Sequence, residues 1–377
     1  MIQGNEMGEI RVLGVMSGTS CDGLDLAWID ANSSSWHVKL TETQAIDYPA
    51  DLRNELRSLG GLSPDVPSEL AAALDLERRW TAWVAAEIQR ACGGKGGREL
   101  CAASLVGFSG QTWYHQPDGR GTRAIGDCAA LSLALGLPVV GDYRSADVAA
   151  GGRGAPLVPL FDAFAFPDHA ACLNLGGIAN LSAGAAAGRR IAWDVCACNL
   201  LLNRQAARLG LPYDKGGALA AAANADTQTR SALDAWPYLK LESPKALAAE
   251  DFEVLHHLLD ALPPEVALAT ATVHIGAAIA RDLRSAVEKP GRVLVTGGGA
   301  WNEALLAAIE IGLNAEAQSW IIDRPTADWV DGKEAAAFAW LALRTACGQT
   351  TSLASATGAR VDVYGGKLYG NFAAQSF

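Results

Sequence analysis

Alternating apolar and polar residues near the start of the chain predict two strands joined by a tight turn. An apolar residue at every second position is the pattern of a strand with one buried face. The alternating residues are Leu13 and Val15 before the turn, and Leu24, Leu26 and Trp28 after it. The turn itself, residues 17–23, consists of small and polar residues. We therefore expect a strand–turn–strand unit over Val12–Asp30.

Two later stretches repeat the passage from an apolar strand into a glycine turn. Cys172–Ser182 (CLNLGGIANLS) contains Gly176-Gly177, and Arg292–Asn302 (RVLVTGGGAWN) contains Gly297–Gly299. The repetition of strand, glycine turn and strand far along the chain suggests two similar lobes. We expect an α/β protein with one lobe formed by 1–140 plus 345–377 and the other by 141–344.

Helical periodicity marks three longer segments. Ser68–Cys92 carries one apolar stripe at i, i+4, i+7, i+8 and i+12. Thr270–Val287 has a similar apolar side, and Asp331–Cys347 is a third helix. Asp331 is suited to cap the last of these, which would make Glu334 either a capping carboxylate or a residue of a binding site.

Composition and charge narrow the class of protein. The chain has 377 residues, of which 50% are apolar and 19% charged, so it is globular and long enough for two lobes. The net charge of −11 argues against nucleic acid or an anionic membrane as the main partner. Met1–Ile10 lacks the features of a secretory signal, so we expect a cytoplasmic protein whose 8 cysteines are reduced.

The first turn is also the first candidate site. Small residues let the backbone approach a ligand closely, and free N–H and hydroxyl groups suit phosphate oxygens. Asp22 is a carboxylate in this turn. A carboxylate beside phosphate is repelled unless a cation lies between them, which suggests Mg²⁺. The alternative is an ordinary hairpin without a ligand.

Other polar residues follow predicted strands, where ligand-binding loops are common. Gln111, Thr112 and His115 follow the strand Leu105–Phe108, with His115 either a sugar contact or a surface residue. Arg144 lies in the glycine-rich stretch after the strand at 139–140. It either grips a phosphate or carboxylate or pairs with an aspartate to brace a hinge.

Asp194 is the candidate general base. It ends a short strand, and a helix is predicted to begin near Asn199. A carboxylate in such a polar position can accept a proton. Cys196 and Cys198 lack a second pair of ligands for zinc. Lys245 either neutralises a phosphate or lies at the surface, and the surface position is the expected one.

The motifs of serine hydrolases, dinucleotide-binding proteins, zinc peptidases and P-loop enzymes are missing. Glycine turns in two lobes together with a few carboxylates suit phosphoryl transfer from ATP. Backbone groups would hold the phosphates, and an aspartate would deprotonate the acceptor.

The chain resembles the anhydro-N-acetylmuramic acid kinase family over nearly its whole length. The matching motifs are GVMSGTSCDGLD (14–25), SGQTWYHQP (109–117), PVVGDYRSADVAAGGRGAPLVP (138–159), NLGGIANLS (174–182), LPYDKGG (211–217), VTGGGAWN (295–302) and EAAAFAWLA (334–342). The resemblance implies a two-lobed actin-like ATPase fold, built from duplicated ribonuclease-H-like domains around a central cleft. It implies a cytoplasmic carbohydrate kinase that uses ATP and Mg²⁺. The resemblance also favours a homodimer as the oligomeric state.

The implied reaction converts 1,6-anhydro-N-acetylmuramic acid into N-acetylmuramic acid 6-phosphate in peptidoglycan recycling. The enzyme would hydrolyse the anhydro bridge and phosphorylate the freed O6. Asp194 would be the base and Glu334 would act at the sugar end. The nucleotide residues would be Gly18, Thr19, Ser20, Cys21, Asp22, Gly23, Leu24, Asp25, Gly176, Gly177, Gly297, Gly298, Gly299 and Asn302, with Asp22 on the metal. The sugar residues would be Gln111, Thr112, His115, Arg144 and Asn199.

Three segments depart from the usual family pattern. Asp-Thr-Gly-Pro-Gly-Asn is Asp194-Val-Cys-Ala-Cys-Asn199 here, and His-Gly-Gln-Thr is Ser109-Gly-Gln-Thr112. The usual Pro-Lys-Ser-Thr-Gly-Arg-Glu run lacks its arginine at 244–250. Two alternatives therefore stay open: a kinase of the same fold for another amino or anhydro sugar, and a non-catalytic protein gated by a nucleotide.

Overall fold

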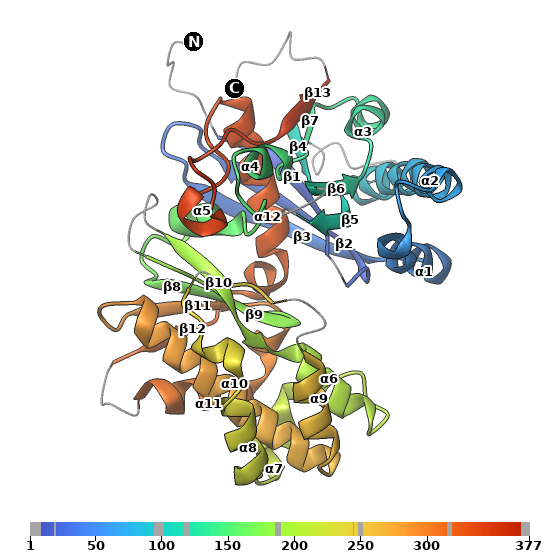
Figure 1. Cartoon of the computed structure of the whole chain (residues 1–377). Helices are drawn as coiled ribbons and strands as arrows, with labels where there is room; N and C mark the ends of the chain where they lie inside the picture. The colour runs from blue at the N-terminus through green and yellow to red at the C-terminus, as the bar shows by residue number, and fades with distance from the viewer. Residues whose placement is uncertain are drawn as a thin grey trace. The chain divides into compact units, whose positions relative to one another are not determined.

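The chain divides into two compact units, one formed by 1–165 with 332–377 and the other by 166–331 (Figure 1). The computed structural model describes residues 9–18, 20–93, 102–116, 121–184, 190–243, 245–247, 252–314 and 319–370. The segments 141–165 and 332–344, which we expected in the second lobe, belong to the first unit.

The first unit is built on a six-stranded sheet of order β13-β7-β4-β1-β2-β3. Strands β1, β2 and β3 form an antiparallel meander, and β4 and β7 join it in parallel beside β1. The strands are β1 (Ile10–Ser17), β2 (Gly23–Ala31), β3 (Val38–Asp47), β4 (Leu105–Phe108), β7 (Val139–Gly141) and β13 (Lys367–Tyr369), with a separate hairpin of β5 (Gln111–Gln116) and β6 (Gly121–Ile125).

The second unit is built on a five-stranded sheet of order β10-β9-β8-β11-β12. Strands β8, β9 and β10 form an antiparallel meander, and β11 and β12 join it in parallel beside β8. The strands are β8 (Ala171–Leu175), β9 (Ile178–Ala183), β10 (Ile191–Ala197), β11 (Arg292–Thr296) and β12 (Ile321–Asp323). Five strands therefore share one order and one set of directions in both units, which confirms the predicted duplication.

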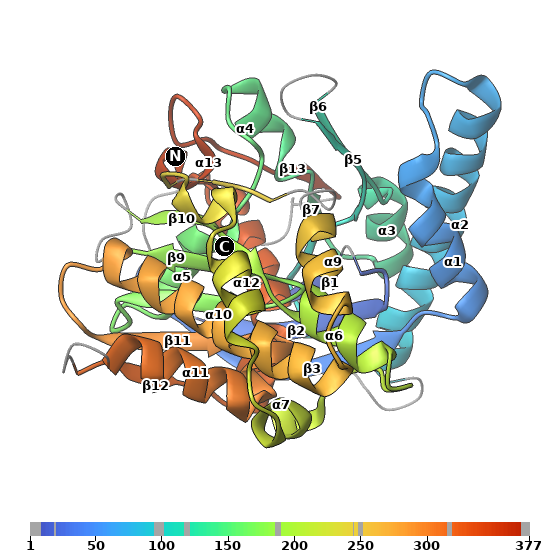
Figure 2. The same cartoon turned by 60° about the horizontal axis from the view of Figure 1, so that its bottom comes forward.

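Helices cover these sheets. Those of the first unit are α1 (Ala50–Ser58), α2 (Pro67–Ala91), α3 (Cys128–Leu135), α4 (Ser145–Ala149), α5 (Val158–Ala165), α13 (Ala354–Thr357) and the short η1 (Leu59–Gly61). Those of the second are α6 (Asn199–Ala207), α7 (Ala218–Ala222), α8 (Thr227–Asp234), α9 (Glu253–Asp260), α10 (Pro264–Ala286), α11 (Glu303–Asn314) and the short η3 (Lys215–Gly217), η4 (Pro237–Lys240) and η6 (Gly298–Trp301). Helix α10 lies beside α11, and α2 lies beside α3 (Figure 2).

The predicted apolar patterns form the two cores. Leu13, Val15, Leu24, Leu26 and Trp28 are buried in the core of the first unit, as the alternation predicts. The stripe on α2 joins the same core, and its Trp80 stacks on Phe108 at a centroid distance of 5.4 Å.

Helix α12 (Ala327–Ala346) begins earlier than the pattern predicts. Asp331 lies inside the helix and cannot cap it, so the capping interpretation of Glu334 is wrong. The helix packs against β1 so closely that a Cβ on Gly14 would lie 1.8 Å from the carbonyl oxygen of Ala335. Gly107 on β4 makes the same kind of approach, because a Cβ there would lie 2.1 Å from the carbonyl oxygen of Phe338.

Two expectations about the chain as a whole need comment. Cys92 is disulfide-bonded, so the expectation of reduced cysteines is wrong at this position. The other cysteines in the described part of the chain are thiols outside disulfides. Helix α10 is long and apolar enough to span a membrane, but 78% of its most apolar window is buried inside the protein, which is typical of a core helix.

Candidate active site

The turn between β1 and β2 is held by residues far away in the sequence. The N–H of Cys21 donates to the carbonyl oxygen of Gly18 over 3.2 Å, and Cys21 has a positive φ of 52°. The N–H of Tyr48 donates to the carbonyl oxygen of Asp22 over 3.1 Å. These hydrogen bonds fix the main chain at Cys21 and Asp22. Thr19, which we expected to contact the nucleotide, lies outside the described residues.

Asp22 already has a cationic partner within the chain. Its carboxylate is 63% exposed and receives a 2.8 Å ion pair from Arg57 on α1. The charge that would repel phosphate is thus compensated by a guanidinium. No group of three metal-ligating side chains occurs among the described residues. One exposed carboxylate fits a Mg²⁺ ion held mainly by phosphate oxygens and water, and does not suffice for a metal centre built by protein ligands.

The remaining residues of the turn differ in exposure. Ser20 is exposed and Gly18 half-buried, whereas Cys21 and Leu24 are buried. Leu24 is part of the core of the first unit, so only its main chain is available to a ligand. Gly23 and Asp25 are half-buried residues of β2.

Gln111 supports this turn through a hydrogen bond to Ser17. It is 2% exposed, and its side-chain oxygen accepts a hydrogen bond from the Ser17 hydroxyl. The Ser17 hydroxyl also lies 2.7 Å from the Tyr48 hydroxyl, and the Ser17 N–H donates to the Ser109 hydroxyl over 3.1 Å. The structure thus gives Gln111 a supporting position, although we expected a sugar contact.

Thr112 and His115 lie further along β5. Thr112 is half-buried, and His115 stands at the exposed end of the strand, with its Nδ1 3.0 Å from the Thr122 hydroxyl. Partial desolvation, and next the positive charge of Arg144, lower the pKa of His115.

Arg144 and Glu334 belong to one charged cluster in the first unit. The Arg144 guanidinium donates to the carbonyl oxygen of Gly154 over 2.9 Å. Burial raises the pKa of Glu334, Lys333 and Arg144 oppose that shift, and Asp162 adds to it. Lys333 in turn makes a buried 3.2 Å ion pair with Asp162 on α5. A carboxyl group with a raised pKa holds its proton more readily, which suits a group that gives and takes a proton.

The glycines of the second unit have different tasks. A Cβ on Gly297 would lie 2.4 Å from Asn174 Oδ1, and one on Gly299 would lie 2.7 Å from the Leu175 Cβ. These two positions are glycine because of close packing. Gly298 is exposed, and its nearest neighbour to such a Cβ would be Asn199 Nδ2 at 3.9 Å. Gly298 therefore offers bare main chain to a ligand.

The turn at Gly176-Gly177 accepts hydrogen bonds from the first residues of helix α6. The Gly177 carbonyl oxygen accepts hydrogen bonds from the N–H groups of Cys198 at 2.8 Å and Leu200 at 3.1 Å. The Gly176 carbonyl oxygen accepts from the N–H of Asn199 at 3.1 Å, and Asn199 Nδ2 donates to the carbonyl oxygen of Leu175 at 2.9 Å. The first residues of α6 are thus tied to this glycine turn.

Asn302 begins helix α11. It is 8% exposed, and its Oδ1 accepts from the N–H of Leu305 over 3.0 Å. This position explains the residue as a helix cap, although we expected a nucleotide contact.

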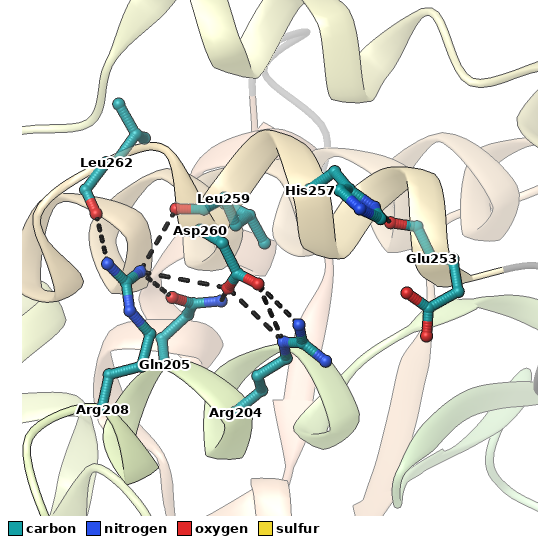
Figure 3. A network of polar contacts seen from close by, with 8 residues as sticks. All are labelled: Arg204, Gln205, Arg208, Glu253, His257, Leu259, Asp260 and Leu262. Atoms are coloured by element: carbon teal, nitrogen blue, oxygen red, sulfur yellow. Dashed lines mark hydrogen bonds and ion pairs between the residues drawn. The ribbon is translucent and has the colours of Figure 1, made fainter.

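Helix α6 is secured at its other end by α9 (Figure 3). Asp260 receives a 2.6 Å ion pair from Arg204 and a 3.0 Å hydrogen bond from Gln205 Nε2. The Arg204 hydrogen bond is the main reason that the pKa of Asp260 is lowered. Arg208 donates to Gln205 Oε1 over 2.6 Å and to the carbonyl oxygen of Leu262 over 2.8 Å. The network fixes the helix that carries Asn199.

Asp194 lies on β10, the edge strand of its sheet, at a bulge between Asp194 and Cys196. Its N–H donates to the carbonyl oxygen of Lys245 over 3.0 Å, and its carbonyl oxygen accepts from the Tyr238 hydroxyl over 2.6 Å. Its carboxylate accepts from the N–H of Leu247 over 3.0 Å. The side chain is half-buried, so it is oriented by the protein and still accessible.

Comparison with known proteins identifies the family. The sequence profile of the family described as anhydro-N-acetylmuramic acid kinase matches residues 10–371. The chain belongs to the anhydro-N-acetylmuramic acid kinase family. It is therefore a carbohydrate kinase, and its two sheets repeat one strand order, as the expected duplicated α/β fold requires.

Two relatives and one solved structure illustrate the similarity. The anhydro-N-acetylmuramic acid kinase of Methylobacterium nodulans is 35% identical over 95% of this chain and 99% of its own length. That of Salinibacter ruber is 36% identical over 92% of this chain and 93% of its own length. The activator of 2-hydroxyisocaproyl-CoA dehydratase from Clostridium difficile, solved with bound ADPNP, is 12% identical, covers 90% of this chain and 96% of its own, and has a TM-score of 0.43.

The structure also shows supporting residues that the sequence did not predict. Lys245 is 7% exposed, so its expected surface position is wrong. Its buried ammonium lies 3.4 Å from Asp282 on α10. Arg57 and Tyr48 hold the first turn, and no motif marks either of them. The one local signal is an alternation over three residues: Lys245 is buried, Ala246 exposed and Leu247 half-buried. Three residues are too few to predict a strand-like segment.

Proposed function

We propose that this kinase hydrolyses the 1,6-anhydro bridge of 1,6-anhydro-N-acetylmuramic acid and phosphorylates O6 with ATP. The products would be N-acetylmuramic acid 6-phosphate and ADP, as in peptidoglycan recycling. The observation that carries the proposal is the family match over residues 10–371. The positions of the candidate residues within each unit support it.

We assign the nucleotide phosphates to two backbone elements. In the first unit, Gly18, Cys21 and Asp22 offer main chain that is held by hydrogen bonds. In the second unit, the exposed Gly177 and Gly298 offer main chain beside the start of α6. Backbone N–H groups suit phosphate oxygens because they donate without adding a mobile side chain. When Mg²⁺ accompanies ATP, it neutralises phosphate charge, and Asp22 is the carboxylate that would hold it.

We assign the chemistry at the sugar to Asp194 and Glu334. Asp194 takes a proton from water as the water oxygen bonds to C1, and the bond from C1 to the bridging oxygen breaks. The freed O6 then attacks the γ-phosphorus and ADP leaves. The raised pKa of Glu334 suits a group that supplies or removes the proton on O6. Arg144, Thr112, His115 and Asn199 remain candidates for sugar binding.

Asp22→Ala tests the metal assignment. If Asp22 holds Mg²⁺, we expect the Mg²⁺ concentration for half-maximal activity to rise about ten-fold, because one carboxylate ligand is lost. The measurement is a Mg²⁺ titration at fixed ATP. Arg57→Ala is the matched control, since it breaks the same ion pair and keeps the carboxylate. If the two variants show the same Mg²⁺ dependence as the wild type, Asp22 is a loop residue and not a ligand.

Asp162→Asn tests the electrostatics around Glu334. The Asp162 charge raises the pKa of Glu334 and Lys333 lowers it. Removing the negative charge also leaves the Lys333 charge uncompensated, so both effects lower the pKa of Glu334. If ionised Glu334 is needed for turnover, the acid limb of the kcat profile should move to lower pH. A shift of the acid limb to higher pH contradicts the assignment. The absence of any shift also contradicts it, if Glu334→Gln is inactive and Glu334 is therefore needed for turnover.

The substrate is tested directly with purified protein, ATP and a panel of anhydro and reducing amino sugars. Mass spectrometry of the product distinguishes the proposals. We expect addition of water and phosphate to 1,6-anhydro-N-acetylmuramic acid. Phosphorylation of another sugar alone would favour the alternative, a kinase of the same fold for that sugar. The altered segments at 109, 194–199 and 244–250 are the reason for keeping this alternative. ATP binding without any phosphorylated product would favour a nucleotide-gated protein.

We further propose a cytoplasmic homodimer that binds neither nucleic acid nor membrane. The net charge of −11 supports the absence of an anionic partner. Sedimentation equilibrium measures the oligomeric state, and a single monomeric species across the concentration range would contradict the dimer.

A further inference from the structure

The edge of strand β10 is covered by a short segment, Lys245–Leu247. This segment follows η4, which is joined to it through 241–244. The N–H of Asp194 donates to the carbonyl oxygen of Lys245 over 3.0 Å, and the N–H of Leu247 donates to Asp194 Oδ2 over 3.0 Å. The segment therefore binds both the main chain and the carboxylate of Asp194.

A second contact fixes the other main-chain group of Asp194. Its carbonyl oxygen accepts a 2.6 Å hydrogen bond from the hydroxyl of Tyr238 on η4. Asp194 stands at the bulge of β10, where the regular ladder to β9 is interrupted. Because the ladder is weakened at this point, the orientation of the residue depends on the partners at the outer edge.

The segment is anchored by a buried ion pair. The Lys245 ammonium lies 3.4 Å from Asp282 Oδ2, with side-chain exposures of 4% and 8%. It also lies 4.9 Å from the centre of the Tyr238 ring. Trp193 Nε1 donates to the same carboxylate over 2.9 Å, and Arg281 forms a 2.7 Å ion pair with its other oxygen. Lysine is rarely buried to this degree unless its charge is paired, as it is here with Asp282.

Leu247 completes the anchoring on its other side. Its side chain packs against the core of the second unit, whereas Ala246 between the two anchors is exposed. The segment is thus pinned at both ends by side chains, and its main chain faces Asp194.

We propose that Lys245 is a positioning residue for Asp194. Its ion pair with Asp282 holds the segment 245–247 against α10, and the segment in turn fixes the Asp194 carboxylate for proton transfer. The proposal rests on the proposed function, because it requires Asp194 to be the base. It assigns to a buried, charged side chain a control of turnover that acts through Asp194.

Lys245→Met is the first test. Methionine keeps the length of the side chain and removes its charge, and Asp282 keeps its contacts to Arg281 and Trp193, so the unit should fold. We expect kcat to fall by roughly 10- to 100-fold with the KM values for ATP and sugar within a few-fold, as for a misplaced catalytic group. Lys245→Arg should recover part of the loss. Lys240→Met is the matched control, since Lys240 is exposed on η4, and its kcat should equal that of the wild type.

Two further variants exclude a merely structural effect. Tyr238→Phe removes only the hydroxyl that donates to Asp194 and should also lower kcat without changing KM. Asp194→Asn combined with Lys245→Met should be no slower than Asp194→Asn alone, because the lysine acts only through the carboxylate. Melting temperatures measured for each variant show whether folding is retained.

The outcomes separate the two proposals. If the wild type phosphorylates the sugar and Lys245→Met keeps full kcat, the positioning role is wrong and the proposed function stands. If the double variant loses a further ten-fold or more, Lys245 acts independently of Asp194 and the proposal is also wrong. If Lys245→Met does not fold, Tyr238→Phe takes its place in the test. A fall in kcat with unchanged KM values supports the positioning role, and an unchanged kcat contradicts it. A wild type inactive on every sugar overturns the proposed function itself.

Discussion

Asp194→Asn is expected to lower kcat by about 10²–10⁴ while ATP affinity stays within a few-fold, since a general base contributes about that much to rate. The amide has nearly the shape of the carboxylate and can still accept from the N–H of Leu247. The bulge and the edge of β10 should therefore persist. Steady-state kinetics with calorimetric titration of an ATP analogue measures both quantities.

Asp226→Asn is the control for this variant. Asp226 caps α8 by accepting from the N–H of Thr229 over 2.7 Å, and asparagine caps helices equally well. The control should retain wild-type kcat. Near-normal turnover of Asp194→Asn would show that another group is the base.

Gly14→Ala is expected to destabilise the protein by at least about 3 kcal/mol, at the upper end of the usual cost of overpacking a core. The new Cβ would lie 1.8 Å from the carbonyl oxygen of Ala335, and both partners are backbone in regular elements. Neither can move without separating β1 from α12. Denaturant unfolding measures the loss of free energy. Because Glu334 precedes Ala335 on α12, the folded fraction should also lose turnover.

Gly61→Ala is the matched substitution. A Cβ at Gly61 would meet no atom within 4 Å, and its φ is not in the left-handed region. We expect unchanged or slightly increased stability, because alanine reduces the entropy of the unfolded chain. Equal stability of Gly14→Ala and Gly61→Ala would mean that β1 and α12 are not packed as described.

The departures from the usual family pattern acquire a physical meaning in the structure. Ser109 accepts a hydrogen bond from the Ser17 N–H, so this position supports the first turn. Cys196 and Cys198 are both buried, and burial raises the pKa of each thiol, that of Cys198 to about 12. They are therefore core residues in neutral form. The lysine of the third segment is the one that anchors Asp194.

The sequence alone determined the elements whose patterns are local. Period-two alternation predicted β1 and β2, the stripe on α2 predicted a buried helix, and repeated glycine turns predicted duplicated units. These predictions were correct because each depends on neighbouring residues that share one face of a strand or helix. The motifs in their order also sufficed to indicate the family.

Only the tertiary structure decided how the candidate site is held. Arg57 reaches Asp22, Asp162 reaches Lys333, and Asp282 reaches Lys245, each across a long stretch of sequence. No local periodicity encodes such pairs, because the free energy of burying a charge depends on which partner the fold brings within a few ångströms. The same reason explains why Lys245 and Gln111 looked like surface or substrate residues in sequence and are buried supports in the folded chain.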